Sequence, residues 1–423
     1  MKRMLPLALS ALLLATTLTT AGENDWPQWR GPDRTGLSAE KGLLKQWSAD
    51  GPPLAWKIKG LGDGFSTPSV ADGRVYVLGT KARQGKAKDE YLIALSTADG
   101  SRAWDLKIGV TAGGYPGPRC TPTVDGDRVY AISSDGKLHC VQRATGKAIW
   151  SKDFKADFGG KAGGWAYTES PLIDGNVLVC TPGGDSSPIV ALNKTTGDVI
   201  WKATLKDLPA GGKRSYTTAG YSSFVVATIH GTKQYVQFLS GGVVGVDAKD
   251  GKLLWHYDRP ANGTANCSTP IVKNDAVFAA SAYGNGGGRA DITKAGSDFT
   301  ATEKYFVKQM QNHHGGMVLV GNHIYGTGSG SLICLDFDSG KIAWEDKSSG
   351  KGSVTYADGH IYARGEKGEI ALVEANPKEY VEKGRFKQPD RSSAAAWAHP
   401  VVSGGKLYIR DMDVLLCYDV KAK

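Results

Sequence analysis

The chain has 423 residues, 41% of them hydrophobic, which is enough for a packed core and excludes an intrinsically disordered protein. The formal net charge of +9 comes from Lys and Arg residues that are scattered singly, so the basic stripe needed for nucleic-acid binding is absent. The length would suit two or three ordinary domains, but internal repeats favour one large repeat fold.

The first 21 residues have the pattern of a secretory signal peptide. Lys2 and Arg3 are basic, residues 5–15 are apolar, and small residues precede an expected cleavage before Gly22. The apolar run is too short to span a bilayer comfortably, and no later segment is apolar enough to do so. No cysteine lies near the cleavage point to carry a lipid. We therefore expect a periplasmic or secreted protein without a membrane span; an uncleaved anchor is the alternative.

A motif that ends in tryptophan recurs along the rest of the chain. Segments such as "CVQRATGKAIW" and "ALNKTTGDVIW" end at Trp104, Trp150, Trp201, Trp255 and Trp344. The first four are spaced by about 50 residues, and the last gap is about twice as long, which indicates one unit that lost its Trp. Repeats of this length are typical of solenoids and propellers.

Each repeat also has a first half that predicts a β-hairpin. Examples are "TPSVADGRVYVL" and "TPTVDGDRVYAI", in which two β-rich runs flank Asp-Gly or a similar pair. Such pairs tolerate positive φ and favour hairpin turns. The second half adds two strands around a Thr-Gly turn. Four antiparallel strands per repeat make a propeller blade.

Eight such units can be counted, so the sequence predicts an all-β, eight-bladed propeller with tryptophan-docking repeats. The eighth unit has three strands, and "PPLAWKIKG" (residues 52–60) should supply its outer strand, with Trp56 in the Trp position. This pairing would close the ring and remove exposed sheet edges. The expected division is a signal peptide at 1–21, an N-terminal strap at 22–52 and the propeller at 53–423.

The repeat resembles the tryptophan-docking repeat of quinoprotein dehydrogenases and of the outer-membrane assembly factor BamB. The opening "DWPQWRGPDRTG" resembles that of exported PQQ-binding-like propellers of planctomycete-type bacteria. The resemblance implies the propeller fold, and it raises pyrroloquinoline quinone with Ca²⁺ as a possible cofactor pair. Two features count against a quinoprotein. The chain lacks the adjacent Cys pair that the resemblance implies, and of the calcium ligands that it implies only Glu169 and Asn266 could be placed.

Candidate site residues are those that differ sharply from blade to blade just before the innermost strand, where one mouth of the channel opens. Recurring Trp, Gly and Pro positions serve packing, whereas a costly residue in one blade suggests a use. The predicted ligand-binding residues are Arg119, Glu169, Asn266, His313, His314, Trp397 and His399. Two alternatives stay open: Arg119 and Glu169 could pair to tie adjacent blades together, and Trp397 could be packing.

We expect no metal at His313-His314, because adjacent residues of a strand point to opposite sides. No catalytic motif is visible, so no catalytic residue is assigned. The predicted function is a binding module that holds a small molecule in the funnel or docks a protein on its face. The alternatives are a quinoprotein alcohol dehydrogenase-like oxidoreductase using quinone and a divalent metal, and a BamB-like envelope assembly scaffold.

Overall fold

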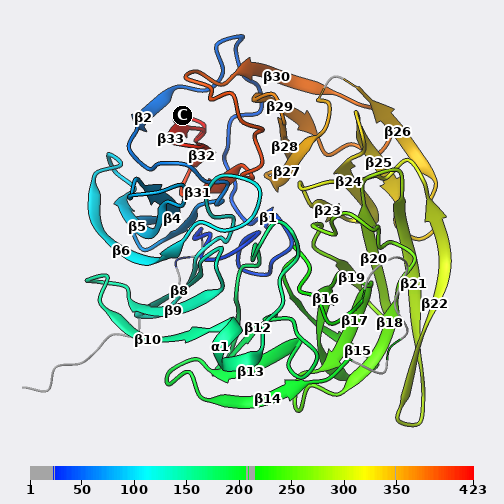
Figure 1. The fold of residues 1–423 in the computed structure, drawn as a ribbon. Helices are drawn as coiled ribbons and strands as arrows, with labels where there is room; N and C mark the ends of the chain where they lie inside the picture. Colours follow the sequence, from blue (N-terminus) through cyan, green and yellow to red (C-terminus); the bar gives the residue numbers. More distant parts are fainter. Residues whose placement is uncertain (1–21, 23, 206–207, 209–214, 348) are drawn as a thin grey trace, which may run out of the picture.

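The protein is a ring of eight β-sheets, as shown by a computed structural model that describes residues 22, 24–205, 208, 215–347 and 349–423. The four strands of each blade pair antiparallel, with the innermost strand toward the centre of the ring and the outermost at the rim (Figure 1). The predicted eight-bladed, four-stranded architecture is confirmed. The expected signal peptide, residues 1–21, lies outside the described residues.

The first four blades follow one another along the chain. Blade one holds β3 (Ser69–Ala71), β4 (Arg74–Lys81), β5 (Asp89–Ser96) and β6 (Arg102–Val110). Blade two holds β7 (Thr123–Asp125), β8 (Arg128–Ile132), β9 (Lys137–Gln142) and β10 (Ala148–Asp153), followed by the helix α1 (Phe154–Phe158). Blade three holds β11 (Leu172–Asp174), β12 (Val177–Cys180), β13 (Ile189–Asn193) and β14 (Val199–Ala203). Blade four holds β15 (Val225–Ile229), β16 (Thr232–Phe238), β17 (Val243–Asp247) and β18 (Leu253–Tyr257).

The next three blades continue the ring. Blade five holds β19 (Ile271–Lys273), β20 (Ala276–Ser281), β21 (Gly286–Ala295) and β22 (Asp298–Val307). Blade six holds β23 (Met317–Val320), β24 (His323–Thr327), β25 (Leu332–Asp336) and β26 (Ile342–Asp346). Blade seven holds β27 (Gly352–Ala357), β28 (His360–Gly365), β29 (Glu369–Glu374) and β30 (Glu382–Lys387), with β1 (Leu37–Ser38) parallel to β27.

The eighth blade is built from both ends of the described chain. It holds β31 (Val401–Ser403), β32 (Lys406–Asp411), β33 (Val414–Asp419) and, as its outer strand, β2 (Leu54–Ile58). β2 runs antiparallel to β33, with Trp56 opposite Cys417 and Lys57 opposite Leu416. The ring closure predicted from "PPLAWKIKG" is therefore confirmed.

Most of the recurring tryptophans join their blade to the next, whereas the indole N–H of Trp255 donates to Gln234 of its own blade. The indole N–H of Trp104 donates to the carbonyl of Arg143 at 2.9 Å, and that of Trp150 donates to the carbonyl of Lys194 at 3.1 Å. A Cβ on Gly146, in the turn that faces Trp104, would lie 2.7 Å from the indole ring, so this turn requires glycine. The tryptophans therefore act in packing, as the repeat pattern indicates.

Each of these tryptophans lies opposite a small residue on the neighbouring strand. Cross-strand partners include Ala94 for Trp104, Cys140 for Trp150, Gly245 for Trp255 and Cys334 for Trp344. A large side chain there would compete with the indole for the same space. This explains why three cysteines occupy positions where other repeats have Ala or Gly.

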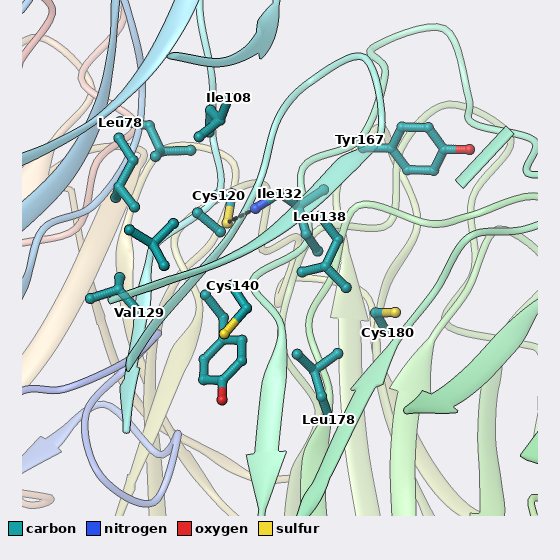
Figure 2. Close-up of a cluster of buried hydrophobic side chains, with 14 of the residues drawn as sticks. Leu78, Ile108, Cys120, Val129, Ile132, Leu138, Cys140, Tyr167, Leu178 and Cys180 are labelled. Carbon is teal, nitrogen blue, oxygen red and sulfur yellow. Dashed lines mark hydrogen bonds between the residues drawn. The ribbon is translucent and has the colours of Figure 1, made fainter. Parts of the chain in front are cut away.

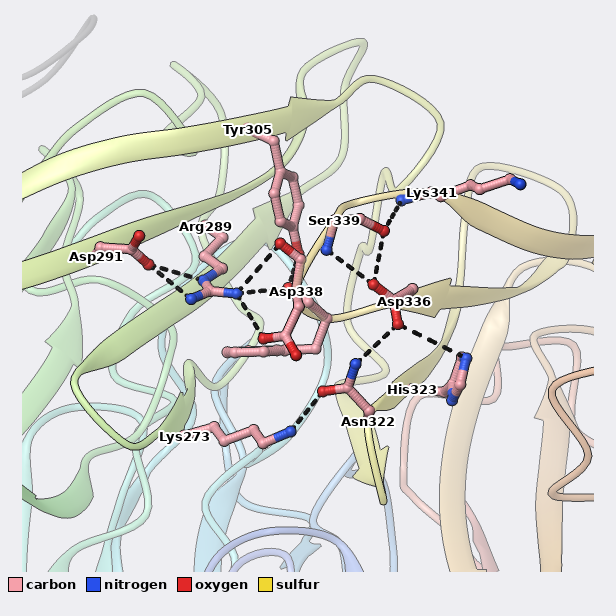
Figure 3. Close-up of polar contacts among 11 residues, drawn as sticks. Lys273, Arg289, Asp291, Tyr305, Asn322, His323, Asp336, Asp338, Ser339 and Lys341 are labelled. Carbon is pink, nitrogen blue, oxygen red and sulfur yellow. Dashed lines mark hydrogen bonds and ion pairs between the residues drawn. The ribbon is translucent and has the colours of Figure 1, made fainter.

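Blade five uses Tyr305 in place of tryptophan. Its hydroxyl donates to the carbonyl of Phe337 in blade six at 2.7 Å, and its ring covers Gly340 in the same way as the indoles cover their glycines. Arg289, opposite Tyr305, reaches the same turn and pairs with Asp338 at 2.8 Å (Figure 3). Tyr305 and Arg289 thus make the contact with the next blade that a docking tryptophan makes elsewhere.

Apolar side chains fill the space between neighbouring blades. Figure 2 shows such a cluster, in which Leu78 of blade one, Leu138 of blade two and Leu178 of blade three share one core. Cys120, Cys140 and Cys180 lie in it as buried free thiols, and the backbone N–H of Ile132 donates to the Cys120 sulfur. All six cysteines of the sequence fall in the described part of the chain and are unpaired there. The five buried ones act as small apolar side chains, and Cys267 lines the axial cavity.

The segment that precedes β2 fills the centre of the ring (Figure 1). Between Trp26 and Ser38 it contacts seven of the eight blades, at or beside their first strands; the partners are Val70, Val124, Ser170, Thr269, Met317, Tyr356 and Val402. Two buried arginines make the innermost of these contacts. Arg34 donates to the carbonyls of Ser170 and Pro171, and Arg30 donates to the carbonyl of Met317.

Candidate functional site

A cavity of about 500 Å³ lies on the axis of the ring, within the size range of small-molecule sites. Trp29 of the central segment belongs to its wall, and the Trp29 indole N–H donates to the Thr269 hydroxyl at 2.9 Å. The other walls come from loops that precede the first strands and from loops between later strands. The exposed side chains of Tyr115 and Tyr283 also line it.

Aromatic rings dominate the lining. They are Trp29, Phe65, Tyr115, Trp165, Tyr221, Tyr283 and Trp397. Trp397 is central among them: its ring centroid lies 4.6 Å from that of Phe65 and 5.0 Å from that of Tyr115. A ring-shaped molecule in this cavity would find flat apolar surfaces on several sides.

Arg119 brings a positive charge to the same cavity. Its guanidinium lies over the Phe65 ring, 5.7 Å from the centroid, and it makes long hydrogen bonds of 3.3 and 3.4 Å to the carbonyls of Gly117 and Tyr115. It forms no ion pair within 4 Å with any described residue. Burial lowers the pKa of Arg119, partly offset by the Glu90 carboxyl group, yet an arginine side chain keeps its charge in proteins.

His313 and His314 meet at the cavity wall, contrary to the strand-alternation argument. They precede β23 in a bend rather than in a strand, so their side chains need not diverge. Their Nδ1 atoms lie 3.0 Å apart, and Nε2 of His313 lies 2.8 Å from the Tyr283 hydroxyl. Burial lowers the pKa of His313 to about 4, so its imidazole is neutral at pH 7.

Glu366, in the loop between β28 and β29, is the one carboxylate that lines the cavity among the described residues. One carboxylate oxygen accepts from the indole N–H of Trp397 at 2.7 Å, and the other pairs with the Lys351 ammonium at 2.9 Å. Its carboxylate lies beside the two histidines, with ligand atoms of the three residues within 4.8 Å of one another. Arg119 is therefore the cation in this cavity that has no acidic partner.

Of the seven sequence-predicted site residues, Arg119, His313, His314 and Trp397 line the cavity. The other three lie behind its wall. Asn266 is buried and spans the carbonyls of Leu239 and Ser240 through its amide group. His399 is buried, its Nε2 bonded to the carbonyl of His314, with its ring 4.5 Å from that of Trp29.

Glu169 is the third of these, and it does not pair with Arg119. Its carboxylate accepts from the backbone N–H of Thr181 at 2.7 Å and from the Gln237 amide at 3.1 Å. Burial raises the pKa of Glu169 to about 8. The prediction that Arg119 and Glu169 could pair to tie adjacent blades together is therefore wrong, because the carboxylate has neutral partners in its own blade and in blade four instead.

The sequence reasoning missed several lining residues. Trp29, Tyr115, Trp165, Tyr283, Lys351 and Glu366 lie outside the positions that lead into each first strand, except that Lys351 directly precedes β27. Trp29 and Trp165 carried a signal, because neither fits the repeat spacing. Glu366 lies in an ordinary turn sequence, so nothing in the sequence marked it as a lining residue.

Eight four-stranded blades, docking tryptophans and an axial aromatic cavity define a propeller of the PQQ-like repeat class. The chain belongs to the family described as outer membrane protein assembly factor BamB, whose model matches residues 31–114, 89–346 and 307–379.

Curated relatives carry the same name. BamB of Shewanella oneidensis is 23% identical over 283 residues, which is 60% of this chain and 63% of that protein. BamB of Burkholderia pseudomallei is 25% identical over 62% of each chain. The match thus spans less than two thirds of these relatives' length. Polyvinylalcohol dehydrogenase of a Sphingopyxis species is 27% identical over 33% of this chain and 22% of its own.

Solved structures share the fold. A quinohemoprotein alcohol dehydrogenase from Pseudomonas putida HK5 superposes with a TM-score of 0.66 at 15% identity, covering 95% of this chain and 81% of that one. BamB from Moraxella catarrhalis gives 0.60 at 14% identity, covering 89% and 100%. In the described part of this chain, no helix is long and apolar enough to cross a membrane.

The residues of the cavity do not fit a quinone with calcium. Calcium takes six to eight oxygen ligands, whereas Glu366 is the single carboxylate in the described lining. The oxygens of Glu169 and Asn266 are engaged behind the wall. The sequence also has no adjacent cysteine pair of the kind that the quinoprotein resemblance implies.

Proposed function

We propose that this protein binds a small, planar, anionic molecule in its axial cavity, acting in the periplasm or outside the cell. The observation that carries the proposal is Arg119, a cation without an acidic partner in a cavity lined by aromatic rings. Arg119 is half-buried, and a charge withdrawn from water is costly unless it is paired or wet. A bound anion would supply a partner for it. The aromatic rings around Trp397, tilted or edge-on to one another, favour a flat ring system over a flexible chain.

The proposal concerns binding, without a catalytic step. Pyrroloquinoline quinone is itself planar and anionic, so it is a reasonable ligand to test without calcium. The ion pair between Glu366 and Lys351 leaves little net charge on that side of the cavity. We therefore expect the anionic group of the ligand to lie near Arg119 and its rings to lie against Phe65 and Trp397.

Binding can be followed by the quenching of tryptophan fluorescence. The probes are pyrroloquinoline quinone and flavin mononucleotide, with riboflavin as the uncharged counterpart of the flavin. We expect an anionic probe to bind, and Arg119→Met to weaken it by about tenfold or more, the effect of losing a charged hydrogen bond. Arg102→Met, which removes an exposed arginine paired with Asp105, is the matched control. Equal binding by wild type and Arg119→Met, or no binding by either anion, would refute the proposal.

A second candidate function is a scaffold in the assembly of outer-membrane proteins. The family match over most of the chain and the BamB relatives favour it. It needs a protein partner on the propeller face, and it is compatible with a ligand in the cavity. Affinity purification of the chain from envelopes of its native host tests it: outer-membrane assembly components should co-purify in constant ratio, and their absence would exclude this role.

A further inference from the structure

The close approach of His313 and His314 needs an explanation. Their Nδ1 atoms face each other at 3.0 Å. Either one Nδ1 carries the proton of a neutral imidazole and donates it to the other, or both are unprotonated and a bound cation lies between them. The Tyr283 hydroxyl contacts Nε2 of His313, and the backbone carbonyl of His314 is bonded to Nε2 of His399.

We propose that His313, His314 and Glu366 form a binding site for a divalent transition-metal ion. With metal–imidazole bonds of about 2.1 Å, two nitrogens lie about 3.0 Å apart at the right angle of a square-planar or octahedral ion and about 3.4 Å apart at the tetrahedral angle. The 3.0 Å between the two Nδ1 atoms lies at the short end of this range. A carboxylate oxygen of Glu366 completes a group whose ligand atoms lie within 4.8 Å of one another. A small rotation of side chains would close this group around one ion.

Neighbouring residues orient two of the three ligands, His313 and Glu366, as in known metal sites. A histidine that binds metal through one nitrogen usually donates its other N–H to an oxygen, and Nε2 of His313 meets the Tyr283 hydroxyl at 2.8 Å. Glu366 is held by the Trp397 indole and the Lys351 ammonium, one on each oxygen. A carboxylate has about four acceptor positions, so it can bind an ion and keep both partners.

The donor set selects the class of ion. Two imidazoles with one carboxylate suit Zn²⁺, Cu²⁺, Ni²⁺ or Fe²⁺, whereas calcium and magnesium prefer oxygen ligands. Three protein ligands leave positions of the ion open, and all three residues line the axial cavity. The ion would therefore stand in the cavity wall, accessible to a water or a small molecule.

This inference does not rest on the binding of an anionic ligand at Arg119, and the two can fail separately. The test uses the full exported chain without a polyhistidine tag, treated with chelator and then titrated with Co²⁺ alone, with visible absorption as the readout. We expect one equivalent to bind and Zn²⁺ to displace it. Arg119→Met should bind Co²⁺ as the wild type does.

Ligand variants decide the outcome. His313→Ala and Glu366→Gln should each lower the Co²⁺ affinity by at least about tenfold, while His230→Ala, a histidine on blade four, should leave it unchanged. Circular dichroism checks that each variant is folded; because His313 is only half-buried, its variant should fold. Absence of Co²⁺ binding to the wild type, or wild-type affinity in both ligand variants, would overturn the proposal.

Discussion

Trp56 in β2 lies directly opposite Cys417 in β33, although 361 positions separate them in the sequence. The Trp56 indole N–H also donates to the carbonyl of Thr97 in blade one at 2.9 Å. One side chain thus completes the eighth blade and joins it to the first. Because a propeller without closure exposes a strand edge, this contact should matter to the whole ring.

We predict that Trp56→Ala lowers the free energy of unfolding by about 3 kcal/mol, as expected for a large aromatic side chain removed from a packed interface. The measurement is urea denaturation followed by tryptophan fluorescence and circular dichroism. Leu54→Ala, on the same strand but exposed, should cost less than about 0.5 kcal/mol. Equal losses for the two variants would show that Trp56 does not hold the ring closed.

Tyr305→Phe should destabilise the protein by about 1 kcal/mol or slightly more. The change removes only the hydroxyl that donates to the carbonyl of Phe337, and leaves that carbonyl without its partner. Tyr91→Phe is the matched control, because no hydrogen bond of its hydroxyl is found among the described residues. If both substitutions are neutral in urea denaturation, Tyr305 is not the substitute for a docking tryptophan.

Arg34→Met tests the central segment. Arg34 donates to the carbonyls of Ser170 and Pro171 at 2.7 and 3.0 Å, and burial lowers the pKa of Arg34 to about 10, so it is charged at neutral pH. Loss of the guanidinium leaves two buried carbonyls unpaired, at a cost of about 3 kcal/mol in unfolding free energy. Arg34→Lys should recover only part of it, since an ammonium cannot span both acceptors as a planar fork does. Wild-type stability in Arg34→Met would contradict this role.

Glu169→Gln should change how stability depends on pH. The folded state raises the pKa of Glu169 to about 8 from a usual value of 4.5, so between these values it holds a proton that the unfolded chain releases. This contribution favours folding at the acidic end and is lost as the pH rises through about 8.

The unfolding free energy of the wild type, minus that of Glu169→Gln, should therefore fall across this window, by at most about 1.4 kcal/mol per pH unit. Urea denaturation at several pH values measures it, with Glu379→Gln at an exposed position as the control. A difference that is constant or rises with pH would show that Glu169 is not a buried, proton-holding carboxyl group.

The architecture could be predicted because its determinants repeat. Trp150 and its counterparts need a small cross-strand partner and a glycine turn in the next blade, and these demands recur at a regular spacing in the sequence. The exceptions were visible only as gaps. The Trp missing from blade five marked the place of Tyr305. Nothing in the sequence showed that Arg289 would contact the same turn of blade six.

The cavity could be predicted only in part, because its residues do not repeat. Position before a first strand placed Arg119 and Trp397 in the lining. The same rule failed for Glu169. Its partners Thr181 and Gln237, from two blades, hold its side chain behind the cavity wall. The rule also placed His313 and His314 in the lining. The strand-alternation argument was the one that failed, because the two histidines lie in a bend outside the strand geometry that it assumed.

The most direct test of ligand binding is a crystal structure of the protein grown with the tightest-binding anionic probe from the fluorescence titrations. The account predicts one molecule on the axis of the ring, with its ring system against Phe65 and Trp397 and an anionic oxygen within hydrogen-bond distance of Arg119. The probe bound on the outer rim or at a blade interface, with the axial cavity free of it, would contradict the account.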